Sequence, residues 1–236
     1  MKKNKIIITQ PTFLPYSGYF SAMYFADNII LLDDVQFEKR SWQQRNRIYT
    51  NHGGTFITVP THTKGKFDQK INEVLINYNT KWSDKILKSI YYNYKNTPFF
   101  DKYFNEFEKI FLQRYNKLID LNINIIKKVN NFLGIDNNKL LLSSKINSKE
   151  KKFDLIYDIY KKLNGDELLT NIGTKKYFPK KLPSDMRASI FEYNEKNELN
   201  KSETKNSEKL SIIDNLFNFG PKTEDLIKNN LNISKY

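Results

Sequence analysis

The chain has 236 residues, a net charge of +13 and no cysteine. The absence of cysteine excludes disulfide bonds, thiol nucleophiles and zinc–thiolate sites. No run of about eighteen apolar residues is present, so the sequence offers no candidate for a membrane-spanning helix.

Length and composition favour one domain in a reducing compartment. A chain of this size can bury a core of its own, and we expect a single α/β domain over residues 1–236. The basic start is followed by only a short apolar stretch, Ile6 to Ile8, which is too short for a secretory signal. We therefore predict a cytoplasmic protein.

The positive charge leaves two interpretations open. Clustered cations would favour a nucleic-acid partner. In this sequence, however, lysines occur in every segment, often beside asparagine, which is typical of solvated faces. Nucleic-acid binding therefore remains an alternative that we do not favour, and a small phosphorylated substrate would be attracted by the same charge.

The first thirty residues have the pattern of a strand, a helix and a second strand. Residues 5–9 are a β-branched apolar run before a proline turn, residues 17–26 have helical spacing, and residues 28–32 are apolar again. Such a unit predicts parallel strands joined by a right-handed crossover. Residues 47–49 and 55–59 flank a turn at 51–54 and predict an added hairpin.

The later elements follow in order. Apolar and aromatic residues at helical spacing predict a helical subdomain at about 80–134, whose aromatic stripes we assign to the core. Further strands are predicted at 140–142, 167–171 and 186–193, and helices at 153–163, 210–219 and 223–231. The polar stretch at about 194–208 predicts a flexible loop.

Polar side chains gather where the first two strands end. In open α/β sheets, ligands bind at the carboxyl ends of the strands, so these residues are candidates for a site. The candidates here are Gln10, Pro11, Tyr16, Gly18 and Tyr19 after the first strand, and Asp33, Asp34 and Gln36 after the second.

Asp33 and Asp34 are the candidate catalytic carboxylates, and Tyr16 and Tyr19 are further catalytic candidates that could donate hydrogen bonds to phosphoryl oxygens. Paired carboxylates can hold Mg²⁺ or accept a proton from an incoming amine, whereas a simple turn at the strand end is an equally good interpretation. Adjacent residues of a strand point to opposite faces, so we expect only one of the two to enter the site, without a choice between them. His52 and His62 have no acidic cluster beside them, and we predict no metal ligands.

The basic run at 39–47 combines cations with ring and amide groups. Guanidinium groups suit pyrophosphate and carboxylate, so this run could clamp either, and an exposed basic loop without a ligand is the alternative. Its candidate binding residues are Lys39, Trp42, Gln43, Arg45, Asn46 and Arg47.

A weaker candidate follows the strand at 167–171. Gly173 permits a tight turn at a strand-to-helix junction and Lys175 supplies charge, which could make a second phosphate cradle. The spacing is not that of a P-loop. Asn171 and Thr174 complete this group.

The order of these segments resembles the WbqC-like family of bacterial proteins. The resemblance is carried by ITQPTFLPYSGYF, ADNIILLDDVQFEKRSWQQRNRI, VP, LLTNIGTKKYF and LSIIDNLFNFG. It implies an association with O-antigen and surface-polysaccharide gene clusters and a suggested glycine transfer to an amino sugar. The family usually has a segment with His, Tyr, Pro and Gln before the last block, where this chain has the Lys/Asn/Glu-rich stretch 194–208.

A second, weaker resemblance concerns the first turn. Pro11, Thr12 and Phe13, followed by Tyr16 to Tyr19, resemble the HxGH position of nucleotidylyltransferases and pantothenate-synthetase-like ligases, with Tyr in place of His. It implies an N-terminal parallel-sheet core of the nucleotide-binding, HUP/nucleotidylyltransferase-like type, with a nucleotide close to Gly18. Packing of the two tyrosines at a strand–helix corner is the alternative interpretation.

The resemblance to the WbqC-like family, together with these candidate residues, implies an enzyme of surface-polysaccharide biosynthesis. It would transfer glycine, or another small acyl or aminoacyl group, to the amino group of a nucleotide-linked amino sugar, with ATP and Mg²⁺ as candidate cofactors. A nucleotidylyltransferase- or glycosyltransferase-like enzyme that acts on a nucleotide sugar is the second hypothesis. A basic nucleic-acid-binding module is the third.

Overall fold

The computed structural model describes residues 3–194 and 209–236 and has a six-stranded sheet at its centre, in the order β5–β2–β1–β6–β7–β8. Neighbouring strands are parallel except β7 and β8. The strands of this sheet are β1 (Lys5–Thr9), β2 (Asn28–Leu31), β5 (Leu140–Leu142), β6 (Glu167–Asn171), β7 (Ala188–Tyr193) and β8 (Leu231–Lys235). The predicted α/β class with a mostly parallel sheet is confirmed.

The connections between the strands change direction between β1 and β6. From β1 the chain moves outward to β2 and later to β5, and it then returns to β6 on the other side of β1 before it continues to β7. In doubly wound sheets, ligands bind outside the carboxyl ends of the strands at such a point. The ends of β1 and β6 therefore mark where a ligand site is expected.

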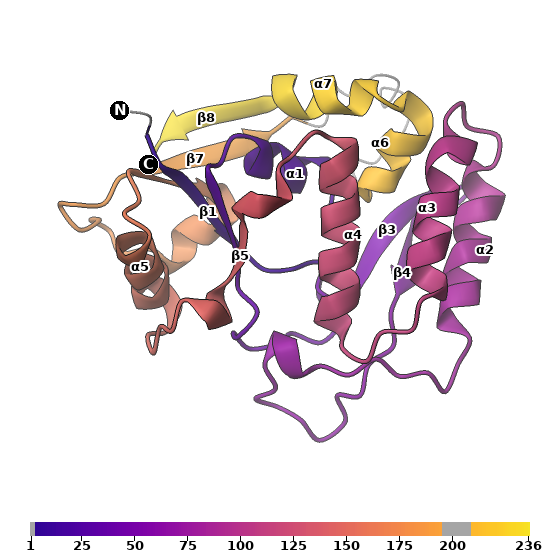
Figure 1. Cartoon of the computed structure of the whole chain (residues 1–236), viewed down its shortest axis with the longest axis horizontal. Coiled ribbons are helices and arrows are strands. Elements are labelled where there is room, and N and C mark those ends of the chain that lie inside the picture. The colour runs from indigo at the N-terminus through magenta and orange to yellow at the C-terminus, as the bar shows by residue number, and fades with distance from the viewer. Residues whose placement is uncertain (1–2, 195–208) are drawn as a thin grey trace.

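Helices surround this sheet and extend beyond it (Figure 1). They are α1 (Ser17–Tyr24), α2 (Trp82–Tyr94), α3 (Phe100–Leu112), α4 (Leu118–Phe132), α5 (Lys152–Lys162), α6 (Ile212–Phe219) and α7 (Lys222–Asn229). Short 3-10 turns are η1 (Ile71–Glu73), η2 (Asn137–Lys139), η3 (Ser143–Lys145) and η4 (Ile172–Tyr177). α5 lies toward one end of the molecule, and α2 and α3 lie at the other.

Both faces of the sheet are buried, because successive side chains of a strand point to opposite faces. Ile7 and Ile29 are paired across β1 and β2 and belong to the larger core cluster, which includes residues of α1, α4, α6 and α7. Ile6 and Ile30 belong to a second cluster with Ile159 of α5. This two-sided burial explains why the strands read as continuous apolar runs.

The helices α2, α3 and α4 share the larger core with the sheet. Most residues of their stripes are buried as predicted, and Ile90 on α2, Phe107 on α3 and Ile125 on α4 are each fully buried. The predicted core residue Tyr91 of α2 is instead 44% exposed. A separate two-stranded antiparallel sheet, β3 (Arg45–Thr50) and β4 (Gly53–Thr58), packs against α2 and α6. It is the predicted hairpin, although its strands begin two residues earlier than expected.

Two of the described elements differ from the prediction. The strand β8 was not predicted, because most of its side chains are exposed at the sheet edge and carry no apolar pattern. The residues after β6 form the 3-10 turn η4 instead of an α-helix. The predicted flexible loop lies, apart from Asn194, outside the described residues.

Candidate functional site

Three neighbouring strands end level at one edge of the sheet. Thr9 of β1 pairs with Leu31 of β2, which in turn pairs with Leu142 of β5. The polar residues that follow these strands therefore lie along one edge: Gln10 after β1, Asp33 and Asp34 after β2, and Ser143 and Ser144 after β5. This edge is the candidate functional site.

Asp33 is a buried carboxylate with four hydrogen-bond donors around it. Its Oδ1 accepts from the Ser143 hydroxyl (3.1 Å) and the Ser144 amide (2.9 Å), and its Oδ2 accepts from the Ser144 hydroxyl (2.7 Å) and Asn72 Nδ2 (3.2 Å). Burial alone would raise the pKa of Asp33, but these hydrogen bonds, led by those from Ser144, outweigh it and hold the pKa below its usual value. Asp33 is therefore an ionised carboxylate whose acceptors are occupied by the protein.

Asp34 is half-buried and accepts a hydrogen bond from the same Ser143 hydroxyl that faces Asp33. The prediction that the two aspartates point to opposite faces is wrong, because β2 ends at Leu31 and the residues after it are no longer extended. Both carboxylates converge on Ser143. Asp34 is the member of the pair that keeps acceptor capacity for a ligand.

Asp33 is not available as a ligand for Mg²⁺. Both oxygens of Asp33 face N–H and O–H donors, whose positive ends would oppose a cation. Within residues 3–194 and 209–236, no three His, Cys, Asp or Glu side chains are grouped as ligands. We therefore assign no step to a metal ion on Asp33 and Asp34.

A buried amide network joins the end of β1 to the basic run. Gln43 Nε2 donates to Gln10 Oε1 (2.9 Å), and Gln43 Oε1 accepts from the amide of Glu38 (3.1 Å). Asn122 of α4 donates from Nδ2 to the carbonyls of Pro11 (3.2 Å) and Gln43 (2.8 Å). Gln43 is 1% exposed, so its side chain holds the edge together, whereas Gln10 is exposed at the edge.

Asn46 has a similar anchoring role. It is 3% exposed, and its Nδ2 donates to the carbonyls of Phe13 (3.1 Å) and Leu14 (2.6 Å). The amide of Phe13 also donates to the carbonyl of Trp42 (2.8 Å). The turn after β1 and the start of β3 therefore form one rigid unit.

The turn from β1 into α1 contains the two predicted catalytic tyrosines. Tyr19 is 8% exposed, and its hydroxyl donates to the carbonyl of Gln10 (3.0 Å). Burial raises the pKa of Tyr19 far above its usual value, so Tyr19 stays a neutral donor. A Cβ on Gly18 would lie 2.5 Å from the Tyr16 ring and 2.6 Å from Tyr193 Cβ. We predicted that a nucleotide lies close to Gly18. In this structure the Tyr16 ring and Tyr193 Cβ occupy the space beside Gly18.

The exposed face of the β3–β4 hairpin carries the predicted arginines. Arg47 pairs directly with Phe56, and the guanidinium carbons of Arg45 and Arg47 lie 4.2 Å and 4.6 Å from the Phe56 ring centroid. The ring of Trp42 lies 5.9 Å from that of Phe56. These four side chains form one cluster, whereas the buried Asn46 faces the other side.

The remaining candidates lie in two other places. Gln36 Nε2 donates to the carbonyl of Phe67 (2.9 Å), and Lys39 Nζ lies 5.5 Å from the Phe67 ring centroid. Both side chains therefore lie beside Phe67, in the segment before η1. After β6, Asn171 Oδ1 accepts from the amide and the hydroxyl of Thr174, both at 3.1 Å. A Cβ on Gly173 would meet Asn171 Oδ1 at 3.1 Å. The side chain of Lys175 lies outside what the structure describes.

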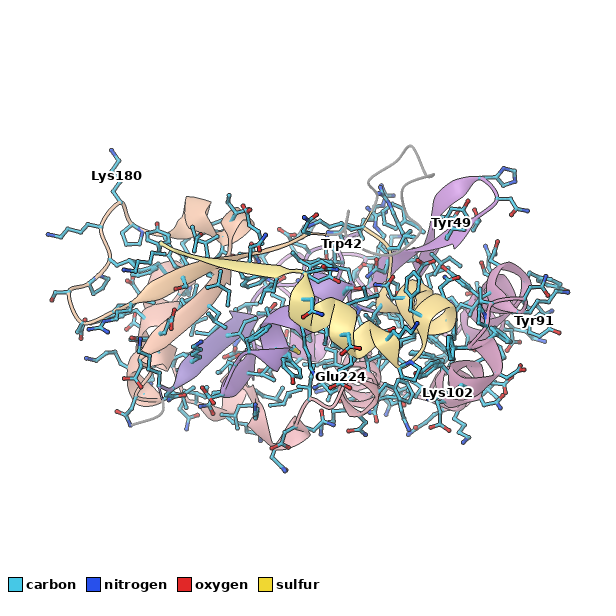
Figure 2. All side chains as sticks on the ribbon, turned by 90° about the horizontal axis from the view of Figure 1, so that it is seen from above. Trp42, Tyr49, Tyr91, Lys102, Lys180 and Glu224 are labelled. Carbon is cyan, nitrogen blue, oxygen red and sulfur yellow. The ribbon has the colours of Figure 1, made fainter. Side chains whose placement is uncertain are left out.

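An open pocket of about 640 Å³ lies away from these residues. It is lined by Phe178, Pro179, Lys180, Leu182 and Tyr236. Figure 2 places Lys180 at one end of the molecule and Tyr49, at the end of β3, toward the other. None of the predicted site residues lines this pocket.

Several residues of the edge were missed by the sequence analysis. Ser143 and Ser144 directly follow the predicted strand at 140–142. They are polar residues at the end of a strand, as Asp33 is, and this position could have identified them. Asn72 and Asn122 gave no local signal, because their partners are distant in the sequence. Phe56 lies in the predicted hairpin and could have been found from its cross-strand position opposite Arg47.

The fold and the edge together define a mixed α/β protein with a polar site at the ends of parallel strands. The chain belongs to the WbqC-like protein family, whose model matches residues 10–226. This confirms the resemblance seen in the sequence, and family membership suggests an association with surface-polysaccharide gene clusters.

The chain is also similar to the "Uncharacterized protein Rv1507c" of Mycobacterium tuberculosis (strain ATCC 25618 / H37Rv). The two are 28% identical over 227 residues, which cover 95% of this chain and 97% of the relative. No solved structure matches the chain, so the HUP/nucleotidylyltransferase-like assignment stays a prediction. Among the described residues, no helix is both long and apolar enough to cross a bilayer.

Proposed function

We propose that the protein is an enzyme of surface-polysaccharide biosynthesis that transfers glycine, or a similar small acyl or aminoacyl group, to the amino group of a nucleotide-linked amino sugar. The observation that carries this proposal is the position of Asp34. Asp34 is half-buried, accepts from Ser143 and lies at the level carboxyl ends of three parallel strands. Family membership supports the polysaccharide context.

The reaction forms one C–N bond and breaks one C–O bond. The carboxyl group of the donor arrives activated, as a mixed anhydride with phosphate or with adenylate formed from ATP. The amino group of the sugar attacks the acyl carbon, and the phosphate or adenylate leaves with the electron pair of the C–O bond. The ammonium form of the amine must lose a proton before attack, and the new amide loses a second proton.

Asp34 is the residue that we assign to proton acceptance. A general base must lie within hydrogen-bond reach of the proton it removes, and Asp34 has acceptor capacity at the strand ends. Asp33 instead holds Ser143, Ser144 and Asn72 in place through its four accepted hydrogen bonds. The burial of Tyr19 keeps it protonated, so it acts as a donor that fixes the Gln10 carbonyl.

The test is incubation of the purified protein with ATP, glycine and a UDP- or dTDP-linked amino sugar. We expect a mass increase of one glycyl unit on the nucleotide sugar. The Asp34→Asn variant should lose turnover by about 100-fold or more, as removal of a general base does. Its stability should change by less than about 1 kcal/mol, because the side chain is only half-buried.

The control for this test is Asp68→Asn, which alters an exposed aspartate in the segment before η1. It should leave both turnover and stability unchanged. Full activity of Asp34→Asn, or absence of a glycylated product with every amino sugar tried, would contradict the proposal.

The strand order supports a second candidate function. The reversal of connections between β1 and β6 is the arrangement of doubly wound nucleotide-binding sheets. A nucleotidylyltransferase- or glycosyltransferase-like enzyme would use the same edge. Release of free nucleoside diphosphate from the sugar, with no glycylated product, would favour this second function.

A further inference from the structure

The Trp42, Phe56, Arg45 and Arg47 side chains form a cluster that no feature of the protein core explains. Trp42 is 44% exposed and Phe56 is 38% exposed, although large aromatic rings are usually buried. We call these four residues the hairpin cluster. Its position on the outer face of β3 and β4 leaves the two rings exposed and the Arg45 side chain partly exposed to solvent.

The second feature of the hairpin cluster is the positive charge of Arg45. Arg45 and Arg47 both lie on the Phe56 ring, at 4.2 Å and 4.6 Å from its centroid, so two like charges are held close together. In the part of the chain that the structure describes, Arg45 has no carboxylate partner. A ligand with negative charge would receive from Arg45 the charge-assisted hydrogen bonds that a guanidinium group offers.

The hairpin cluster is tied to the turn that follows β1. Asn46 lies between the two arginines in the sequence and is anchored to the carbonyls of Phe13 and Leu14. The carbonyl of Trp42 accepts from the amide of Phe13. A ligand on the hairpin cluster would therefore lie beside the turn that follows β1, with little ordering of the protein needed on binding.

We propose, building on the function proposed above, that the hairpin cluster binds the nucleoside diphosphate group of the nucleotide-linked sugar. The base stacks on the exposed rings of Trp42 and Phe56, and Arg45 binds the diphosphate. Aromatic rings suit any base, because every base has a π-face, and the planar guanidinium group of Arg45 suits a diphosphate. The sugar is thereby directed toward the carboxyl ends of the strands.

The experiment is a titration of the full-length protein with UDP and dTDP, followed by fluorescence and by calorimetry. The chain has two tryptophans, and Trp82 is only 5% exposed, so a ligand stacked on Trp42 should quench the exposed component. Uridine alone and pyrophosphate alone should each bind about tenfold or more weakly than UDP, because each makes only part of the contacts. Trp42→Phe should lose the quenching and keep most of the affinity.

Two variants test the assigned roles. Arg45→Gln should weaken UDP binding by about tenfold or more, with Arg45→Lys intermediate, because lysine keeps the charge and loses the planar fork. Phe56→Leu should weaken it by a similar factor. Circular dichroism melting confirms that each variant is folded before its affinity is compared.

The chain offers matched controls. Arg114 lies 4.7 Å from the Tyr78 ring centroid, so Arg114→Gln removes an arginine stacked on a ring elsewhere. Tyr49 is 41% exposed on the same hairpin, so Tyr49→Leu removes an exposed ring close to the cluster. Both controls should bind UDP as the wild type does.

Three results would overturn the assignment. One is UDP and dTDP binding that Arg45→Gln and Phe56→Leu leave unchanged. Another is binding of ADP at the cluster without binding of UDP or dTDP, which would make it a site for ATP. The third is binding of arbitrary DNA in preference to UDP with a steep fall in affinity as salt rises, which would make it a nucleic-acid surface.

Failure of this assignment differs from failure of the proposed transfer reaction. UDP affinity is measured without turnover, so a protein that transfers no glycine can still bind UDP at the cluster. Asp34→Asn should abolish the transfer and leave the UDP affinity unchanged.

Discussion

The side chain of Gln43 donates from Nε2 to Oε1 of Gln10 over 2.9 Å, across 33 positions of sequence. Gln43 is 1% exposed, whereas Gln10 is exposed at the end of β1. The bond joins the first strand of the sheet to the run that carries the hairpin cluster. Because Gln43 is buried and Gln10 is exposed, we expect substitutions of these two residues to change the stability by different amounts.

We expect Gln43→Ala to lower the free energy of unfolding by about 2 kcal/mol, because the amide of Glu38 loses its acceptor inside the protein. Gln10→Ala should cost less than about 1 kcal/mol, because water can replace the exposed partner. Urea denaturation measures both values. Gln36→Ala, which removes an exposed glutamine bonded to Phe67, is the control, and equal costs for Gln43 and Gln10 would contradict the expectation.

Asn122 fixes the turn after β1 to α4. Asn122→Leu should lower the free energy of unfolding by about 3 kcal/mol, since the carbonyls of Pro11 and Gln43 both lose a buried donor. The matched control is Asn124→Leu, because Asn124 is exposed on the same helix and bonds only to the Asp120 carbonyl. If the two variants are equally stable, the buried contacts of Asn122 do not hold the turn.

Gly18 should not tolerate a side chain. Gly18→Ala places a methyl group 2.5 Å from the Tyr16 ring and 2.6 Å from Tyr193 Cβ, and we expect a loss of about 2 kcal/mol or more. Gly173→Ala is the control, because its methyl group would meet only the side chain of Asn171 at 3.1 Å. Thermal melting compares the two variants. An unchanged melting temperature for Gly18→Ala would show that the space beside Gly18 can accommodate a methyl group.

Asp33 should make stability depend on pH in the acid range. The pKa of Asp33 is lower in the folded chain than the usual value of about 3.9, so the unfolded state binds more protons there and stability rises with pH. The contribution is complete above about pH 4 and is lost as the pH falls through the folded pKa.

The variant that tests this is Asp33→Asn. At neutral pH it should be about 3 kcal/mol less stable than the wild type, because the donors of Ser143, Ser144 and Asn72 lose a charged acceptor. The difference should shrink as the pH falls through the folded pKa of Asp33, where the wild-type carboxyl group also becomes neutral. A difference that stays constant from pH 7 to acid would show that the effect is not ionic.

The strands of the parallel sheet could be predicted from local sequence. β1, β5 and β6 have the predicted bounds, because each is a short apolar run ended by a turn or a polar residue. The core helices were also predictable, since their apolar residues recur at helical spacing. The edge strand β8 was not, because its pairing with β7 supplies the hydrogen bonds and its side chains remain exposed.

The candidate site divides in the same way. The sequence by itself determined that polar residues follow β1 and β2, because apolar runs set where those strands end. Only the tertiary structure decided their roles. Whether a side chain such as Asp33 or Gln43 is saturated by distant donors, or like Asp34 and Arg45 keeps capacity for a ligand, depends on partners that folding brings together from far along the chain.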